Sequence, residues 1–348
     1  MGQARCGSRE LPPGGDSPNC AAPLGLRVGK DQVRSDCLAQ ETPPFLTRFK
    51  RVAEIAPMQL TERDRDVIRQ VHRHRFLRSS HITALVGGST PQLLRRLQLL
   101  YHHRYLERPR SQIDYYHRGG SRRIVYGLGS KGASLLKRES TPAFREFNWS
   151  EKNRGIGRLF LEHALLISDV IVSLELACRK SGRVRLLIGG DISIPDATSR
   201  QREPFRWKVT LSNRQKLGLI PDQVFALESA NQPSGRNRAF YFLEADRATM
   251  PVVRQNLFQT SFFRKLLAYE ATWTQGIHRS RFGFHRFRVI TVTSSPRRVE
   301  NLVAACQNLE RGHGLFLFAD RHSLAQADPL AYDWKAGRPH ETARLLDF

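Results

Sequence analysis

The chain has few of the features that mark secreted, membrane-spanning or zinc-binding proteins. It contains five cysteines in 348 residues, and no two of them form a Cys-x-x-Cys pair, so neither a zinc site nor a disulfide framework is indicated. No run of 18 uncharged apolar residues is present, which argues against a membrane-spanning helix. The N-terminus lacks the apolar segment of a signal peptide. We therefore expect a cytoplasmic protein with no membrane partner.

Acidic residues are also scarce, since 32 Asp and Glu are outnumbered by 56 Lys and Arg, for a formal net charge of +24. A chain this basic usually has a polyanionic partner, and nucleic acid is the first candidate. A genome rich in G and C, which favours Arg over Lys, is the alternative explanation. No G-x-x-x-x-G-K-[ST] loop is present, so ATP dependence is not expected.

The length predicts two domains, and the apolar fraction of 40% is sufficient for their cores. Residues 1–57 are rich in Gly, Pro and Ser without a sustained period, which indicates a disordered leader. Periodicity then predicts a first domain over residues 58–140, a second over residues 150–320, and a loosely packed tail over residues 321–348.

Residues 58–140 show the order of a winged helix-turn-helix, three helices followed by a hairpin. Thr61 is a good N-cap for the first helix. The third helix starts at Pro91, a favoured first helical position, and runs to about His103. Two short apolar runs, residues 105–107 and 123–128, predict the hairpin, and a last helix follows it.

The third helix has the amphipathic character of a recognition helix. Leu93, Leu97, Leu100 and Tyr101 fall on one side at 100° per residue, with polar side chains opposite. The domain and its flank, residues 58–150, hold 18 Lys and Arg against 7 Asp and Glu. A solvated basic face on an ordinary helical module is the alternative. The predicted contacts to double-stranded DNA, from this helix and from a basic wing loop, are Gln92, Arg95, Arg96, Gln98, His102, Arg118, Arg122 and Arg123.

The second domain is predicted to alternate helices and strands. His163 lies in the apolar stripe of the first of these helices and is expected to be a hydrogen-bonded core histidine. An almost uninterrupted apolar strand at residues 287–293 is typical of a buried parallel strand. The predicted elements are a helix over 154–180, strands over 184–188, 207–211, 219–227 and 239–247, a helix over 254–273, the strand over 287–293, a helix over 295–309 and a final strand over 314–318.

Carboxylates gather at the ends of two neighbouring strands of this domain. Side chains alternate along a strand, so Glu244 and Asp246 point to the same face, and Asp222 on the paired strand can reach that face. Converging carboxylates repel one another unless a cation lies between them. The pattern predicts an Mg²⁺ or Mn²⁺ site. The alternative is that these acids simply end their strands in water.

The order helix, strand, strand, strand, helix, strand, with Pro221-Asp222 and Glu244-Ala245-Asp246, resembles the PD-(D/E)xK nuclease core. The resemblance implies a restriction-endonuclease-like α/β domain in which Asp222 and Glu244 bind metal. Those nucleases place a lysine two positions after the second acid, and Asp246 stands there in this chain. Lys265, on the next predicted helix, is the candidate substitute, so the predicted catalytic set is Asp222, Glu244, Asp246 and Lys265.

The whole arrangement resembles the replication-relaxation family of bacterial mobile elements, through Ile220-Pro221-Asp222 and the run from Phe242 to Thr249. The resemblance implies a DNA-binding protein acting in plasmid replication or DNA relaxation, with plasmid replication or mobilisation proteins as partners. Winged-helix proteins often form homodimers, although no coiled-coil heptads are visible. A metal-dependent endonuclease guided by the winged helix is the second hypothesis, and an RNA-binding or assembly protein is the third.

Overall fold

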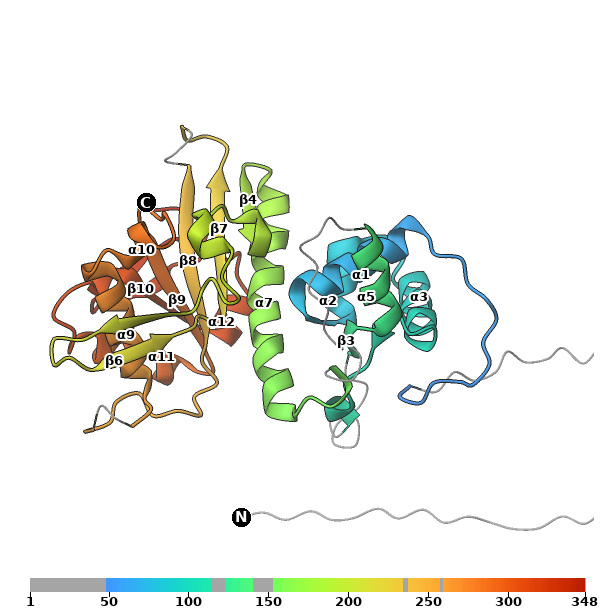
Figure 1. Cartoon of the computed structure of the whole chain (residues 1–348), viewed down its shortest axis with the longest axis horizontal. Helices are drawn as coiled ribbons and strands as arrows, with labels where there is room; N and C mark the ends of the chain where they lie inside the picture. The colour runs from blue at the N-terminus through green and yellow to red at the C-terminus, as the bar shows by residue number, and fades with distance from the viewer. Residues whose placement is uncertain (1–47, 114–122, 140–152, 234–236, 257–258, 348) are drawn as a thin grey trace, which may run out of the picture. The chain divides into compact units, whose positions relative to one another are not determined.

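The computed structural model describes residues 48–113, 123–139, 153–233, 237–256 and 259–347. All of them belong to one compact unit. Helices and sheets are mixed throughout this unit (Figure 1), which confirms the expected α/β class. We call residues 48–139 the N-terminal module and residues 153–347 the C-terminal module.

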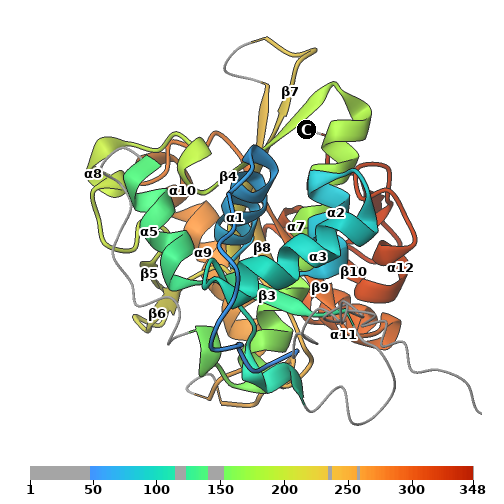
Figure 2. The same ribbon diagram turned by 90° about the vertical axis from the view of Figure 1, so that its right-hand side faces the viewer.

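The N-terminal module contains the predicted three helices and hairpin, with one further strand. Its elements are α1 (Glu62–His74), β1 (Phe76–Arg78), α2 (Ser79–Val86), α3 (Thr90–His102), β2 (Leu106–Glu107), β3 (Val125–Leu128) and α5 (Ser130–Glu139). β2 and β3 pair antiparallel, which confirms the hairpin. β1 pairs with the other side of β3. With three residues, β1 is too short to show a period in the sequence. Figure 2 turns this module toward the viewer.

The core of the N-terminal module explains why α3 lies where it does. Leu93, Leu97 and Leu100 are at most 1% exposed and pack into one cluster with α1 and α2, as the periodicity predicts. α1 begins at a reciprocal cap, in which the Thr61 backbone donates to the Asp64 carboxylate (2.8 Å) and the Asp64 backbone donates to the Thr61 hydroxyl (3.2 Å). α3 is therefore held by its apolar face, and its other face is left for solvent or a ligand.

The expectation that residues 1–57 form a disordered leader is wrong for their described part, residues 48–57. The Arg51 guanidinium lies over the Tyr101 ring, 4.6 Å from its centroid, and pairs with Glu107 at 2.9 Å. Glu107 is 2% exposed. Because a buried carboxylate needs a partner, this segment is part of the fold.

The C-terminal module is built on a seven-stranded sheet in the order β12-β11-β10-β9-β8-β7-β4. Its helices are α7 (Arg158–Ser181), α8 (Asp196–Ser199), α9 (Phe262–Thr274), α10 (Ile277–Ser280), α11 (Pro296–Cys306) and α12 (Arg321–Ala325). Its strands are β4 (Val184–Ile188), β5 (Trp207–Thr210), β6 (Lys216–Leu219), β7 (Gln223–Ser229), β8 (Arg238–Ala245), β9 (Phe287–Thr293), β10 (Phe316–Asp320), β11 (Trp334–Ala336) and β12 (Thr342–Ala343). β8, β9 and β10 run parallel, and the other neighbours in the sheet are antiparallel. β5 and β6 form a separate hairpin.

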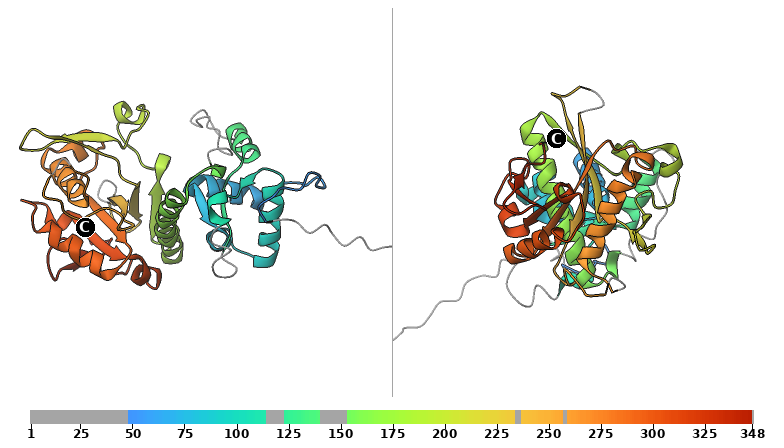
Figure 3. Two further views of the ribbon diagram at one scale, coloured as in Figure 1. Left: turned by 90° about the horizontal axis from the view of Figure 1, so that it is seen from below. Right: turned by 90° about the vertical axis from the view of Figure 1, so that its left-hand side faces the viewer.

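Helices cover both faces of this sheet (Figure 1 and Figure 3). Phe242 of β8 faces α9 and α11, whereas its neighbours Tyr241 and Leu243 face α7 and α12. The alternation follows the period of two in a strand. With both faces covered, the central strands are largely apolar on both sides, and their charged side chains lie near the strand ends.

α7 joins the two modules, and its surface differs from the prediction. Phe160 is 38% exposed, so the apolar stripe predicted from the sequence is not wholly buried. His163 is not a core histidine, because its side chain is 27% exposed. Farther along, the Ser168 hydroxyl donates to the backbone oxygen of Phe76 (2.7 Å), which ties α7 to β1.

α9 begins at Phe262, eight residues later than the predicted start at Arg254. In the described residues between Arg254 and Phe262, the Arg254 side chain donates to the Thr260 backbone oxygen (3.1 Å) and no helix is present. The Phe262 backbone nitrogen donates to Pro251 (3.0 Å) instead of to a preceding helical turn. A run of apolar residues in helical spacing therefore extended the prediction past the true N-terminus.

The prediction of a loosely packed tail over residues 321–348 is wrong. Trp334 and Leu345 are both fully buried, in the cluster that α7 forms with the sheet. The Tyr241 hydroxyl of β8 donates to the backbone oxygen of Leu345. β10 is therefore not the last strand, and β11 and β12 complete one edge of the sheet.

Candidate functional site

Asp222 and Glu244 lie next to each other at one end of β7 and β8. Gln223 is paired with Leu243 in the antiparallel register, which places Asp222 beside the end of β8. The Asp222 carboxylate accepts a hydrogen bond from the backbone nitrogen of Ala245 (2.8 Å). Both acids line a pocket of about 270 Å³, together with Asp246, Lys265 and His163. The structure thus places all four residues predicted as catalytic around one pocket.

Glu244 is buried and bound on both carboxylate oxygens. Its Oε2 contacts the Nζ of Lys265, and its Oε1 accepts a hydrogen bond from the Tyr269 hydroxyl (2.5 Å). Burial raises the pKa of Glu244 to about 7, because the charged form loses its hydration, and the charge of Lys265 opposes this effect. Burial alone would lower the pKa of Lys265, but the carboxylates of Glu244 and Asp222 outweigh it and raise that pKa.

Asp222 has a different environment from its neighbour. Burial alone would raise its pKa, but the hydrogen bond from His163 and the charge of Lys265 outweigh burial and hold the pKa below its ordinary value. His163 Nε2 lies 3.1 Å from Asp222 Oδ1. Sequence reasoning missed this contact because His163 and Asp222 are 59 positions apart. One sequence feature could have indicated the contact. His163 is a histidine on an otherwise apolar helical stripe, and the acidic motif offers it a partner elsewhere in the chain.

Asp246 lines the same pocket, and its charge helps to raise the pKa of Lys265, but its carboxylate is bound by residues outside the predicted catalytic set. Its carboxylate accepts hydrogen bonds from the Arg298 guanidinium (2.8 and 3.3 Å) and from the Thr293 hydroxyl (2.8 Å). Arg298 also donates to the backbone oxygen of Met250 (2.7 Å). Asp246 follows the last residue of β8, Ala245, and lies against the first turn of α11. Its role in the structure is to fix the turn after β8.

The carboxylates fit an Mg²⁺ or Mn²⁺ ion poorly. These ions prefer six oxygen ligands in near-octahedral geometry, whereas the described residues contain no group of three or more His, Cys, Asp or Glu side chains arranged to hold a metal. Each of the four oxygens of Asp222 and Glu244 already accepts from, or contacts, a protein donor. The pocket is a network of charges and hydrogen bonds satisfied from within the protein.

The residues predicted to contact DNA fall into several groups. Gln92 and Arg95 are exposed on α3. Gln98 is half-buried and already engaged in an interaction. Arg123, just before β3, is exposed. Two residues of the predicted wing loop, Arg118 and Arg122, lie outside the described residues.

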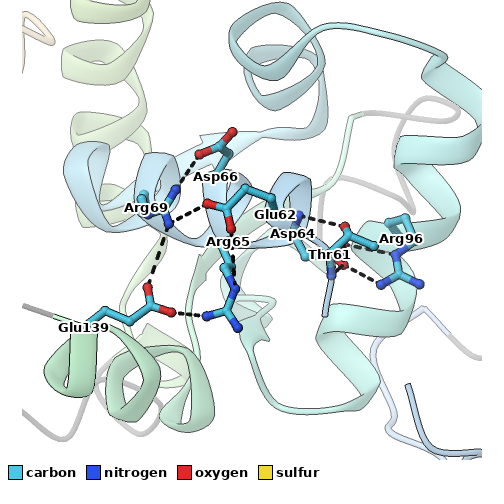
Figure 4. Close-up of polar contacts among 8 residues, drawn as sticks. All are labelled: Thr61, Glu62, Asp64, Arg65, Asp66, Arg69, Arg96 and Glu139. Carbon is cyan, nitrogen blue, oxygen red and sulfur yellow. Dashed lines mark hydrogen bonds and ion pairs between the residues drawn. The ribbon is translucent and has the colours of Figure 1, made fainter. Parts of the chain in front are cut away.

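Arg96 is engaged inside the N-terminal module (Figure 4). Its Nε donates to Asp64 (3.0 Å) and its Nη2 donates to the backbone oxygen of Gln59 (2.9 Å). Burial alone would raise the pKa of Asp64, but the bonds from Arg96 and Thr61 hold it below its ordinary value. Arg96 therefore stabilises the cap of α1, a role that its place on the flank of the predicted polar face did not reveal.

The prediction that His102 contacts DNA is wrong. It is 4% exposed, and its Nδ1 lies 3.3 Å from the backbone nitrogen of Val52. Burial, helped by the charges of Arg108 and Arg51, lowers the pKa of His102 to about 4. The segment before α1 covers this end of α3, so His102 is not available to DNA in this structure.

Two arginines of α1, Arg65 and Arg69, are paired with acids, unlike Arg95 of α3. Arg69 lies 2.7 Å from both Glu62 and Asp66, and Arg65 pairs with Glu139 of α5 (Figure 4). On the described part of α3, by contrast, Arg95 has no ion pair within the described residues. Arg95 of α3 is therefore less compensated than Arg65 and Arg69 of α1.

Among the described residues, no helix has the length and apolar character needed to cross a membrane. Cys178 and Cys306 are buried free thiols. No curated protein and no solved structure is significantly similar to this chain. A family model described as replication-relaxation matches residues 68–286, which include α3 and the pocket with Asp222, Glu244 and Lys265. The chain therefore belongs to the replication-relaxation family.

Proposed function

We propose that this protein binds double-stranded DNA through α3 and acts in plasmid replication or DNA relaxation, or in their control, in a bacterial mobile element. The observation that carries the proposal is the exposed polar face of α3, where Gln92 and Arg95 project from a helix fixed by Leu93, Leu97 and Leu100. The element order α1, β1, α2, α3, β2, β3 supports a winged helix-turn-helix, in which this helix enters the major groove.

The charge distribution supports the same proposal. The net charge of +24 is large, and phosphate contacts supply most of the affinity of such proteins for DNA. Residues 151–348 hold 30 Lys and Arg against 19 Asp and Glu. The C-terminal module therefore also carries an excess of basic residues that can contact DNA phosphates. Homodimerisation on a palindromic site, and contacts with plasmid replication or mobilisation proteins, are further parts of the proposal.

The test is the affinity for a labelled DNA duplex over a series of salt concentrations. We expect affinity to fall steeply with salt, because each neutralised phosphate contributes a slope of about −0.9. Arg95→Ala should weaken binding about tenfold and reduce the slope by about 0.9 if it contacts phosphate. The matched control is Arg286→Ala, which removes another exposed arginine and should bind normally. Affinity that does not change with salt would refute the proposal.

A second candidate function is endonuclease activity dependent on a divalent metal. The observation in its favour is the contact between Lys265 and Glu244 in a pocket shared with Asp222, since the sequence has no lysine at the usual motif position. Against it stand the poor fit of the carboxylates to a metal and the engagement of the Asp246 carboxylate by Arg298 and Thr293. Nicking of supercoiled plasmid with Mg²⁺ or Mn²⁺ that disappears in Asp222→Ala would establish this activity, whereas equal nicking by that variant would indicate a contaminant.

A further inference from the structure

The carboxyl ends of the three parallel strands bring two arginines to one level of the sheet. In the register of β8, β9 and β10, Ala245 pairs with Val292, and Val292 pairs with Ala319. Counting two residues onward along each strand, Arg247, Ser294 and Arg321 occupy equivalent positions beyond the paired region. Ligands of open α/β sheets bind at this kind of edge, outside the carboxyl ends of the strands.

A large groove lies along this edge, with a volume of about 1290 Å³. Arg247, Ser294 and Arg321 line it together with α7 and residues of α2. Leu159 and Thr249 are among the residues that line both this groove and the pocket containing Asp222 and Glu244. The groove therefore leads directly to the carboxylate pocket.

The charge of the groove is positive and only partly compensated. Among the described residues, five arginines line it, against the three acids Glu162, Asp169 and Asp246. All three of these acids are already engaged, by Arg158 at 2.9 Å, by Arg78 and by Arg298 at 2.8 Å respectively.

Arg247 and Arg321 are the least compensated of the groove's arginines at the sheet edge. Arg247 lies 3.9 Å from Glu162, a carboxylate that already has a closer partner. Arg321 is exposed and has no acidic partner in the part of the chain that the structure describes. Two guanidinium groups at one level of a sheet edge are suited to successive phosphates of a nucleic-acid backbone.

The walls of the groove favour a single strand over a duplex. Leu159 is 62% exposed, Ala84 and Ala325 are exposed, and Leu176 is half-buried. All four line the groove. A duplex keeps the apolar faces of its bases stacked inside and presents phosphates, whereas a single strand offers its bases to apolar side chains as well.

We propose that this groove binds a single DNA strand, with Arg247 and Arg321 on its phosphates, and leads it to the pocket of Asp222, Glu244 and Lys265. The inference rests on the proposed function, DNA binding. It adds single-stranded DNA as a second ligand and the groove as a second binding surface. α3 takes the duplex, and the groove takes the unpaired strand that replication or relaxation exposes.

The test compares the double variant Arg247→Ala/Arg321→Ala with the double variant Arg286→Ala/Arg311→Ala. Both residues of the control pair are exposed and precede β9 and β10. The control therefore removes the same charge from the amino-terminal ends of the parallel strands, opposite the groove. The probes are an oligo(dT) of about 20 nucleotides, longer than the site size of a single domain, and a duplex of the same length. Thermal unfolding of each variant checks that the fold is kept.

We expect the groove variant to lose at least about tenfold in oligo(dT) affinity, and its salt slope to fall by about 1.4, since each phosphate on a single strand contributes about 0.7. Its duplex affinity should change less than about twofold, and the control should bind both probes normally. Arg247→Lys/Arg321→Lys, which keeps the charge, should retain most of the affinity even if the alanine variant unfolds.

Equal losses in the groove and control variants, or equal losses for oligo(dT) and duplex, would overturn the proposal. Arginine-dependent binding of oligo(U) that is tighter than that of oligo(dT) would also overturn it, in favour of RNA. Failure of the proposed function has a different signature. If the wild-type protein shows no affinity for the duplex and still binds oligo(dT) through Arg247 and Arg321 in the variant comparison, that result would refute duplex binding by α3 but would support the groove as a single-strand site.

Discussion

The exposed face of α3 and the carboxylate pocket of the C-terminal module differ in whether their charged groups have partners within the protein. Arg95 extends into solvent with no ion pair among the described residues. In the pocket, every oxygen of Asp222 and Glu244 has a protein partner. A surface with an unpaired cation can bind an anionic ligand. Carboxylates whose hydrogen bonds all come from the protein instead contribute to the stability of the fold. The comparison favours DNA binding over hydrolysis as the function of this chain.

The largest effect should follow from breaking the pair of Asp246 and Arg298. Both side chains are largely buried, at 4% and 11% exposure. Asp246→Ala leaves the arginine charge without its partner, so we expect a loss of about 3–5 kcal/mol in the free energy of unfolding, measured by urea denaturation. Asp246→Asn, which keeps an acceptor for Thr293, should lose less. An Asp246→Ala protein of normal stability that has lost an observed nicking activity would instead place Asp246 in catalysis.

The next effect concerns the pH dependence of stability. The pKa of Glu244 is about 7 in the folded protein, above its ordinary value of 4.5. The unfolded chain therefore loses this proton near pH 4.5 and the folded chain near pH 7, so stability from this group is present below pH 4.5 and lost as pH rises to 7. At 1.36 kcal/mol for each pH unit, the loss is about 3 kcal/mol.

Glu244→Gln should remove this loss, which is measured by urea denaturation between pH 4.5 and 7.5. Asp222 acts in the opposite direction, because its pKa is below the ordinary value and its contribution is lost as the pH falls. The difference between wild type and variant isolates Glu244 from Asp222. A variant that loses as much stability as the wild type over this range would show that Glu244 is ionised throughout, and would weaken the contrast between the two regions.

The smallest effect should come from the exposed pairs of α1. Arg69 and Glu62 are 45% and 70% exposed, where water screens the attraction. We expect Arg69→Ala to change the free energy of unfolding by less than about 0.5 kcal/mol, and to leave duplex affinity within about twofold of wild type. A large loss of duplex affinity in this variant would move the binding surface from α3 to α1.

Local patterns predicted the parts of the molecule that depend on neighbours in sequence. The cap at Thr61, the buried stripe of α3 and the strand at residues 287–293 are all present. The order of acids along two paired strands also predicted that Asp222 and Glu244 would meet. These features follow from periodicity and from the end effects of helices and strands.

Contacts between distant positions were not predictable in the same way. Arg298 lies 52 positions from Asp246, so no local pattern revealed that this acid is occupied. Val52 lies 50 positions from His102, and the burial of His102 depends on that segment folding back. Trp334 anchors a tail whose prolines and glycines suggested loose packing. In each case, tertiary packing decided between a surface residue and a structural one.

The most direct test of the central claim is a photo-crosslink from α3 to duplex DNA. Leu94 is 42% exposed and lies beside Arg95, so a photoreactive amino acid at this position should not disturb the core. We expect efficient crosslinking to a duplex from position 94, and none from position 300, an exposed site on α11. Crosslinking from position 300 but not from position 94 would contradict the assignment of α3 as the DNA-binding surface.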